Sequence, residues 1–245
     1  MENRILLEDF SYVAFLNIDN FKSTGSWFFL QKNGYDYLIT ARHILYDENG
    51  SLRWEQMLVR PNHIWDCSEI CWFNVRLSED CIIQDINSDI AIINFGNIQN
   101  NQLSDFITEE NKWITPVSIS EDKTKWVNHF MITSDIYLVW FPTSLISRDN
   151  LFDPTKPLVT KGIISWKNNQ SNTFVVDASS YYGNSGWPII ALSEDKKLYI
   201  IGFVSRYIPF ITNWYNDREK SIIHTEISNS GYSMCIPIDS IIKLI

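Results

Sequence analysis

Short strand-like runs separated by polar turns dominate this sequence and leave little room for long helices. The runs are rich in Ile, Val, Tyr, Phe and Trp, and their spacing is typical of an all-β sandwich or barrel. They cover residues 12–18, 25–30, 35–40, 71–77, 90–95, 130–132, 136–141, 159–166, 173–177, 187–192, 198–205 and 232–237. This number of strands is too large for one small barrel, so the pattern predicts two antiparallel barrels of six strands each.

A polar stretch at 97–126 divides these runs into two groups. We therefore predict two domains, an N-terminal barrel at 1–110 and a C-terminal barrel at 111–245. The tail at 237–245 predicts a short terminal helix, with Asp239 or Ser240 near its start.

The composition and charge of the chain disfavour some classes of binding partner. With 45% hydrophobic residues the chain can bury a substantial core, and its formal charge of −9 disfavours nucleic acid and anionic membrane surfaces. No run approaches the length of a membrane span, and the first ten residues lack a basic region followed by an apolar stretch. These features predict a cytoplasmic protein with no membrane or nucleic-acid partner.

The cysteines do not form a standard disulfide framework. Cys67, Cys71, Cys81 and Cys235 have irregular spacing, so free buried thiols are the first expectation. His63 lies four residues before Cys67, which leaves a zinc site as an alternative, but the spacings match no well-specified zinc pattern. We predict no metal and no cofactor.

The segment Gly183-Asn-Ser-Gly186 has the composition of a tight turn that exposes a nucleophile. Glycines permit unusual backbone angles and let a substrate carbonyl approach the main chain. The same residues are common in ordinary turns, so the fragment alone also fits a plain hairpin. A catalytic serine would need a histidine to remove its proton.

Two residues beside apolar strands fit the partners that such a serine needs. His43 follows the apolar run at 37–40, a rigid mount for a general base, although a structural histidine also fits that place. Asp89 directly precedes the apolar run at 90–93, whereas Asp80 and Asp85 lack such a context. A carboxylate in this role holds the tautomer of the histidine and stabilises its imidazolium form.

Together these fragments resemble the trypsin/chymotrypsin-like serine peptidases, especially bacterial members without disulfides. The resemblance rests on Thr40-Ala-Arg-His43, on Asp89-Ile-Ala-Ile, on Gly183-Asn-Ser-Gly-Trp-Pro188, and on their order along the chain. Flanking segments at 25–29, 159–163, 202–205 and 234–238 are also similar to family strands. The resemblance implies two barrels with the active site at their interface.

The resemblance implies a role for each matching residue. Ser185 would be the nucleophile, His43 the general acid and base, and Asp89 its orienting carboxylate. The N–H groups of Gly183 and Ser185 would form the oxyanion hole. Ser205 matches the family serine that hydrogen-bonds the triad aspartate.

The same comparison implies a set of substrate-binding residues. Ser179 and Ser180 match the base of the primary specificity pocket, without an aspartate to attract Lys or Arg. Arg206 and Tyr207 match the rim of that pocket, although ordinary surface packing explains them equally well.

Two positions depart from the family pattern. Trp187 replaces a glycine, and its indole must repack the neighbouring barrel surface without removing an oxyanion donor. Asn184 replaces the aspartate of zymogen-type members, which predicts a site that needs no N-terminal processing.

The sequence thus predicts an intracellular serine endopeptidase that cleaves one or a few protein partners, with control by a regulatory protein as one option. Two alternatives stay open, a catalytically silent peptidase-fold binding module and an esterase-like hydrolase.

Overall fold

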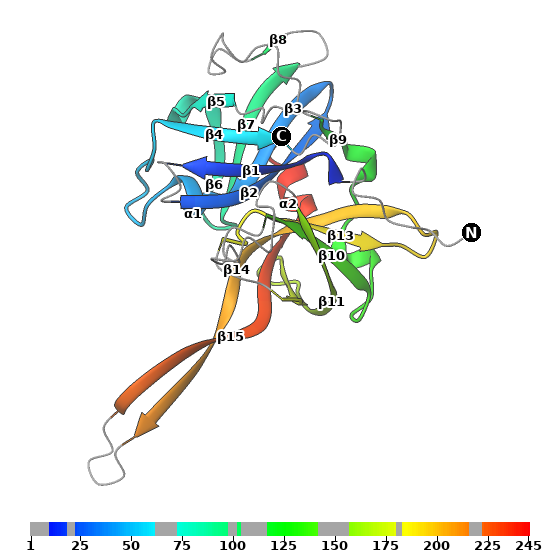
Figure 1. The fold of residues 1–245 in the computed structure, drawn as a ribbon. Helices are drawn as coiled ribbons and strands as arrows, with labels where there is room; N and C mark the ends of the chain where they lie inside the picture. Colours follow the sequence, from blue (N-terminus) through cyan, green and yellow to red (C-terminus); the bar gives the residue numbers. More distant parts are fainter. Residues whose placement is uncertain are drawn as a thin grey trace.

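A computed structural model describes residues 10–18, 23–61, 73–97, 102–103, 117–141, 157–179, 183–215 and 222–245. Figure 1 shows two β bodies, one above the other in this view, with a long two-stranded arm extending from the lower one. Strands account for most of the described elements.

The N-terminal body is one antiparallel-rich sheet. Its main path follows the order β5-β4-β1-β2-β3-β7-β6, with β8 added to β7 and β9 added to β2. The strands are β1 (Val13–Ile18), β2 (Ser23–Lys32), β3 (Tyr35–Ala41), β4 (Gln56–Pro61), β5 (Phe73–Arg76), β6 (Ile82–Asp85), β7 (Ile90–Asn97), β8 (Gln102–Leu103) and β9 (Ile119–Ser120).

The C-terminal body is a closed barrel in the order β10-β11-β12-β15-β14-β13. Its strands are β10 (Asp135–Trp140), β11 (Leu158–Asn168), β12 (Thr173–Asp177), β13 (Pro188–Leu192), β14 (Leu198–Tyr215) and β15 (Ile222–Pro237). The described helices are α1 (Arg42–Leu45), α2 (Ile238–Ile242) and short 3-10 turns at Glu79–Cys81, Glu121–Lys123 and Val127–His129.

The predicted all-β, two-barrel architecture with a short C-terminal helix is confirmed. Among the described residues the N-terminal sheet has nine strands rather than the six expected, and β4, β6, β8 and β9 were not predicted from the sequence. The strand predicted at 130–132 is wrong, since Phe130 ends the 3-10 turn Val127–His129 and an irregular turn follows it.

A shared core holds the two bodies together. Ile238 and Ile241 of α2 belong to the same buried cluster as the interior of the N-terminal sheet, as does Phe203 of β14. Lys32 of β2 donates hydrogen bonds of 2.7 Å to the carbonyl oxygens of Ile242 and Ile245. The C-terminal segment therefore packs on the N-terminal sheet and fixes the interface between the bodies.

The structure describes only two of the four cysteines, so it bears on the expected free thiols only in part. Of the four cysteines, Cys81 is half-buried and free, and Cys235 is buried and free. His63, Cys67 and Cys71 lie outside the described residues, so the zinc alternative is untested there; elsewhere in the described chain no metal-binding cluster occurs. No helix in the described ranges is long and apolar enough to cross a membrane.

Candidate active site

His43 is positioned by the end of a buried strand. β3 ends at Ala41, and the single helical turn α1 follows, anchored by the buried side chains of Ile44 and Leu45. The His43 side chain is about half exposed, at 47%. The anchored turn thus holds an accessible imidazole just beyond the end of β3.

Asp89 lies beside this turn because of strand register. β3 pairs with β7 so that Ala41 lies opposite Ile90, which brings the residue before β7 next to the residues after β3. The Arg42 N–H donates to the Asp89 carbonyl at 2.9 Å, and the His43 N–H donates to Asp89 Oδ1 at 3.0 Å. Asp89 has a left-handed φ of 52°, which is uncommon for a residue other than glycine.

Ser185 lies in a tight turn pressed against the N-terminal sheet. Gly183 and Gly186 both have positive φ, at 94° and 87°. A Cβ on Gly186 would lie 2.0 Å from the Ser26 carbonyl oxygen of β2, so only glycine permits this approach. The turn therefore carries Ser185 from the C-terminal barrel to the boundary with the N-terminal sheet.

Across this boundary the three residues form one hydrogen-bonded chain. His43 Nε2 lies 3.0 Å from Ser185 Oγ, and His43 Nδ1 lies 2.9 Å from Asp89 Oδ2. The buried Ser205 hydroxyl donates to Asp89 Oδ2 at 2.5 Å. When Nδ1 carries the ring proton, it donates a hydrogen bond to the Asp89 carboxylate. Nε2 then has a free lone pair that can accept the Ser185 proton.

Asp89 is held in its charged form. Burial opposes ionisation of this carboxyl, but the hydrogen bond from His43, the nearby imidazole and the hydrogen bond from Ser205 outweigh it. The pKa of Asp89 is therefore lowered from its ordinary value of 3.8.

The predicted substrate-binding residues are less closely gathered. Ser179 is exposed just after β12, and Ser180 lies outside the described residues. Arg206 is exposed on β14, where its guanidinium lies 3.8 Å from the Met234 sulfur, and Tyr207 beside it is 37% exposed. Of the described members of the predicted set, only Ser205 hydrogen-bonds to one of the three central residues.

The two residues that depart from the family pattern, Trp187 and Asn184, are both buried. Trp187 is buried and stacks on Trp140, with ring centroids 4.8 Å apart and an interplanar angle of 20°. The Trp187 backbone N–H donates to the Asn184 carbonyl at 3.2 Å, which ties the turn to the residue that makes the stack. Asn184 is buried, and its amide finds no hydrogen-bond partner among the described residues.

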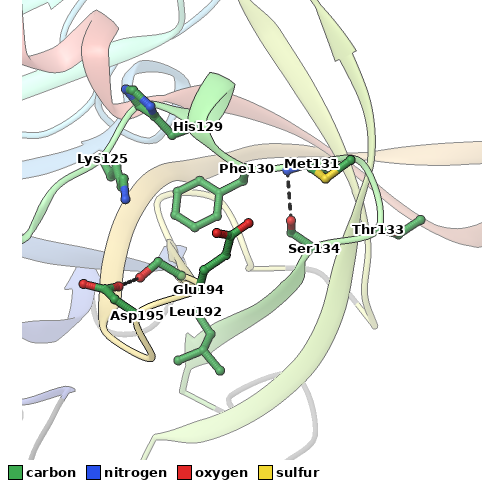
Figure 2. Close-up of a pocket in the computed structure, with 10 residues that line it drawn as sticks. Lys125, His129, Phe130, Met131, Thr133, Ser134, Leu192, Glu194 and Asp195 are labelled. Atoms are coloured by element: carbon green, nitrogen blue, oxygen red, sulfur yellow. Dashed lines mark hydrogen bonds between the residues drawn. The ribbon is translucent and has the colours of Figure 1, made fainter.

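A separate hollow of about 480 Å³ lies between the 125–134 segment and the turn after β13. Figure 2 shows Phe130, Glu194 and Lys125 around it, and neither His43, Asp89 nor Ser185 contributes to its lining. The hollow is open to solvent and carries mixed charge. The residues that line this hollow share no sequence motif, so the sequence gives no signal from which it could have been predicted.

No protein-family model and no curated protein matches the sequence. Among solved structures, a Glu endopeptidase in complex with MPD is 15% identical, with a TM-score of 0.55 over 93% of this chain and 84% of its own. A serine endoprotease from Yersinia pestis is 16% identical, with a TM-score of 0.54 over 99% of this chain and 66% of its own.

The structure called Deg5 is also 16% identical, with a TM-score of 0.53 over 99% of this chain and 95% of its own. Identities this low carry information about the fold rather than the reaction. The closed C-terminal barrel, the N-terminal sheet and these likenesses show that the chain has the chymotrypsin-like serine peptidase fold.

Proposed function

We propose that this chain is a serine endopeptidase in which Ser185 is the nucleophile, His43 the general acid and base, and Asp89 the orienting carboxylate. The observation that carries the proposal is the continuous chain of contacts, 3.0 Å from Ser185 Oγ to His43 Nε2 and 2.9 Å from His43 Nδ1 to Asp89. Distances of this size are within the reach needed for proton transfer.

In the proposed reaction, Ser185 Oγ attacks the scissile carbonyl carbon while His43 Nε2 accepts its proton. The imidazolium is stabilised by Asp89 and then donates the proton to the leaving amine, which releases the first product and leaves an acyl-enzyme. Water then attacks the ester by the same proton route and frees Ser185. Every step uses side chains of this chain and needs no cofactor.

The proposed oxyanion hole is formed by the N–H groups of Gly183 and Ser185. Among the described residues neither group donates a hydrogen bond, while the neighbouring Gly186 N–H is occupied by the Val204 carbonyl at 2.8 Å. The positive φ of Gly183 supports the sharp turn that such a pair of donors requires. Removing one donor of this kind typically lowers the rate by about 100-fold or more.

The proposed substrates are proteins or peptides. Ser179 and Ser180 stay our candidates for the base of the specificity pocket, and Arg206 and Tyr207 for its rim. A cytoplasmic location, a narrow range of substrates and control by a regulatory partner are further parts of this proposal, taken from the sequence. A pocket that prefers Lys or Arg would need a carboxylate from elsewhere in the chain, such as Asp217 or Glu219, and both lie outside the described residues.

Two other functions fit the fold. A binding module that has lost catalysis has no need to keep the three residues in contact, so the observed geometry favours an enzyme. An esterase-like hydrolase would share the acyl-enzyme chemistry and the same three residues.

A peptide library derived from a proteome, digested with wild-type protein and with Ser185→Ala, tests the proposal directly. We expect new peptide termini with wild-type protein and none with Ser185→Ala, because the rate loss on removing the nucleophile is about 10⁶-fold in enzymes of this kind. Hydrolysis of small esters without any peptide cleavage would favour the esterase. The absence of both activities would favour the binding module.

A further inference from the structure

The arm is a two-stranded ribbon formed by the outer parts of β14 and β15. Its pairs run from Pro209 opposite Asn229 to Tyr215 opposite Ile222, and Figure 1 shows it projecting away from both bodies. Inside the barrel, β14 pairs with β13 as far as Phe203, and β15 pairs with β12 from Tyr232 onward. Beyond them the described strands do not pair with either outer edge of the ribbon.

The arm is rich in exposed apolar side chains. Seven large ones are each more than half exposed: Phe210, Ile211, Trp214, Tyr215, Ile222, Ile223 and Ile227. An isolated two-stranded ribbon is marginally stable in water, and independent stability takes three or more strands with an apolar face. The arm therefore has both the open edges and the side chains of a sheet that is completed by another chain.

The two outer edges differ in how readily they can accept another strand. On β14 the register shifts between Tyr207 and Pro209, and a proline cannot donate a backbone hydrogen bond. Irregularity and proline are the devices by which edge strands avoid pairing. On β15 the segment from Ile222 to Ser228 contains three isoleucines and neither proline nor glycine, which favours pairing on that side. Its register with β14 is regular from His224 to Ser228, and the shift near the end of the arm leaves only Ile223 without a partner on β14.

The β15 segment is complementary to itself in one antiparallel register. When Thr225 lies opposite Thr225 of a second copy, Ile223 lies opposite Ile227, and His224 lies opposite Glu226. Apolar cross-strand pairs stabilise a sheet, and a His224 ring N–H can donate a hydrogen bond to the Glu226 carboxylate opposite it. The two-fold axis makes each of these pairs occur twice. Centring the pairing on Glu226 instead places two carboxylates opposite each other, which is destabilising.

We infer that two copies of this chain associate through the outer edges of their β15 strands, antiparallel about Thr225. The product is a four-stranded sheet in which Ile211, directly opposite Ile227 within each copy, extends a shared apolar surface. Such a sheet exceeds the strand number at which a β structure becomes stable. The inference is independent of the proposed catalysis, because the pairing residues do not contact His43, Asp89 or Ser185 in the described structure.

Sedimentation velocity with charge-exchanged variants tests the register. Wild-type protein is expected to sediment with twice the monomer mass. His224→Glu should weaken dimerisation by about tenfold or more, because it places two carboxylates opposite each other twice. The double variant His224→Glu/Glu226→Lys places a carboxylate opposite an ammonium and should recover the dimer. A monomeric wild-type protein, or a double variant that dimerises no more strongly than His224→Glu, would overturn the inference.

A cysteine at the two-fold axis provides an independent readout. Oxidised Thr225→Cys is expected to form a disulfide-linked dimer, because its two copies lie opposite each other within disulfide reach. Ser228→Cys is the matched control, since its copies lie on opposite sides of the axis and should stay unlinked. Equal linking of both variants, or none in Thr225→Cys, would contradict edge pairing, including the case of a dimer packed through the faces of the arm.

Discussion

Asp89 contributes to the site through its side chain, its backbone and its unusual conformation. Its carboxylate accepts hydrogen bonds from the His43 backbone, the His43 ring and the Ser205 hydroxyl, while its carbonyl accepts from the Arg42 N–H. The left-handed φ of 52° is the strained conformation that makes these contacts simultaneous. One residue therefore connects the helical turn of His43 with both sheets.

The first prediction concerns the charge of this carboxylate. Asp89→Asn keeps the shape of the side chain but favours the wrong tautomer of His43, so kcat for peptide cleavage should fall by roughly 10⁴-fold. The measurement is steady-state kinetics on a peptide cleaved by wild-type protein, with circular dichroism to verify the fold. A loss smaller than tenfold would contradict the role assigned to Asp89.

The second prediction follows from the lowered pKa of Asp89. Because the folded-state pKa lies below the unfolded-state value, the ionised carboxylate stabilises the fold above the ordinary value of 3.8 and loses this effect as pH falls through the folded-state pKa. The difference in the free energy of unfolding between wild-type protein and Asp89→Asn should therefore be largest near neutral pH. Urea denaturation at pH 7 and near pH 3 measures it, and a difference that grows in acid would refute the assignment.

At the scale of elements, the site depends on the close approach of the Ser185 turn to β2. The Ser26 N–H lies 3.4 Å from the Ser185 carbonyl oxygen, and Gly186 packs directly on the Ser26 carbonyl. Behind the turn, Trp187 stacks on Trp140 of β10, a contact that fills the barrel end where the family pattern has glycine. The turn is thus held from both sides by regular strands.

The third prediction tests this approach with two glycines that share a positive φ. Gly186→Ala adds a Cβ that overlaps the Ser26 carbonyl oxygen, so it should destabilise the fold by about 3 kcal/mol or more. Gly50 also has a positive φ, of 83°, but a Cβ there would meet only Arg42 Nη2 at 3.6 Å. Gly50→Ala should therefore lower the free energy of unfolding by only about 1 kcal/mol. Urea denaturation of both variants measures the difference, and equal losses would show that backbone strain alone matters.

Local sequence explains some elements better than others. His43 and Asp89 could be predicted as partners because each adjoins an apolar run and matches a motif of the peptidase family. The register of β3 with β7 then brings them together in the structure. β4 and β6 are short and carry polar side chains at several positions, which hides their strand period. The outer arm was missed because Pro209, Asn213 and Thr225 interrupt the apolar pattern of β14 and β15, and no local feature indicates the stacking of Trp187 on Trp140.

At the scale of the whole molecule, the two bodies form the site together. His43 and Asp89 come from the N-terminal sheet, Ser185 and Ser205 come from the C-terminal barrel, and α2 fixes the interface through the shared core. The resemblance of the motifs and of their order to the trypsin-like peptidases implied this convergence, because the active site of that family lies at the interface of two barrels. The division of the chain at residue 110 stays a prediction.

The state of Asn184 leads to the last prediction. In zymogen-type relatives a new N-terminal ammonium pairs with an aspartate at this position, whereas the neutral Asn184 cannot supply that ion pair. Asn184 is buried here beside a turn already tied by the Trp187 N–H and the Gly186 N–H. The 245-residue chain should therefore have a competent site without N-terminal cleavage.

Fluorophosphonate titration of this chain, followed by intact-mass analysis and peptide mapping, is the most direct test of the central claim. We predict one adduct per unprocessed chain, located on Ser185, and no adduct on His43→Ala, which keeps the serine but lacks its base. An unlabelled Ser185 in folded wild-type protein, or labelling at another residue, would contradict the assignment of the nucleophile. Labelling that appears only after loss of N-terminal residues would contradict the prediction for Asn184.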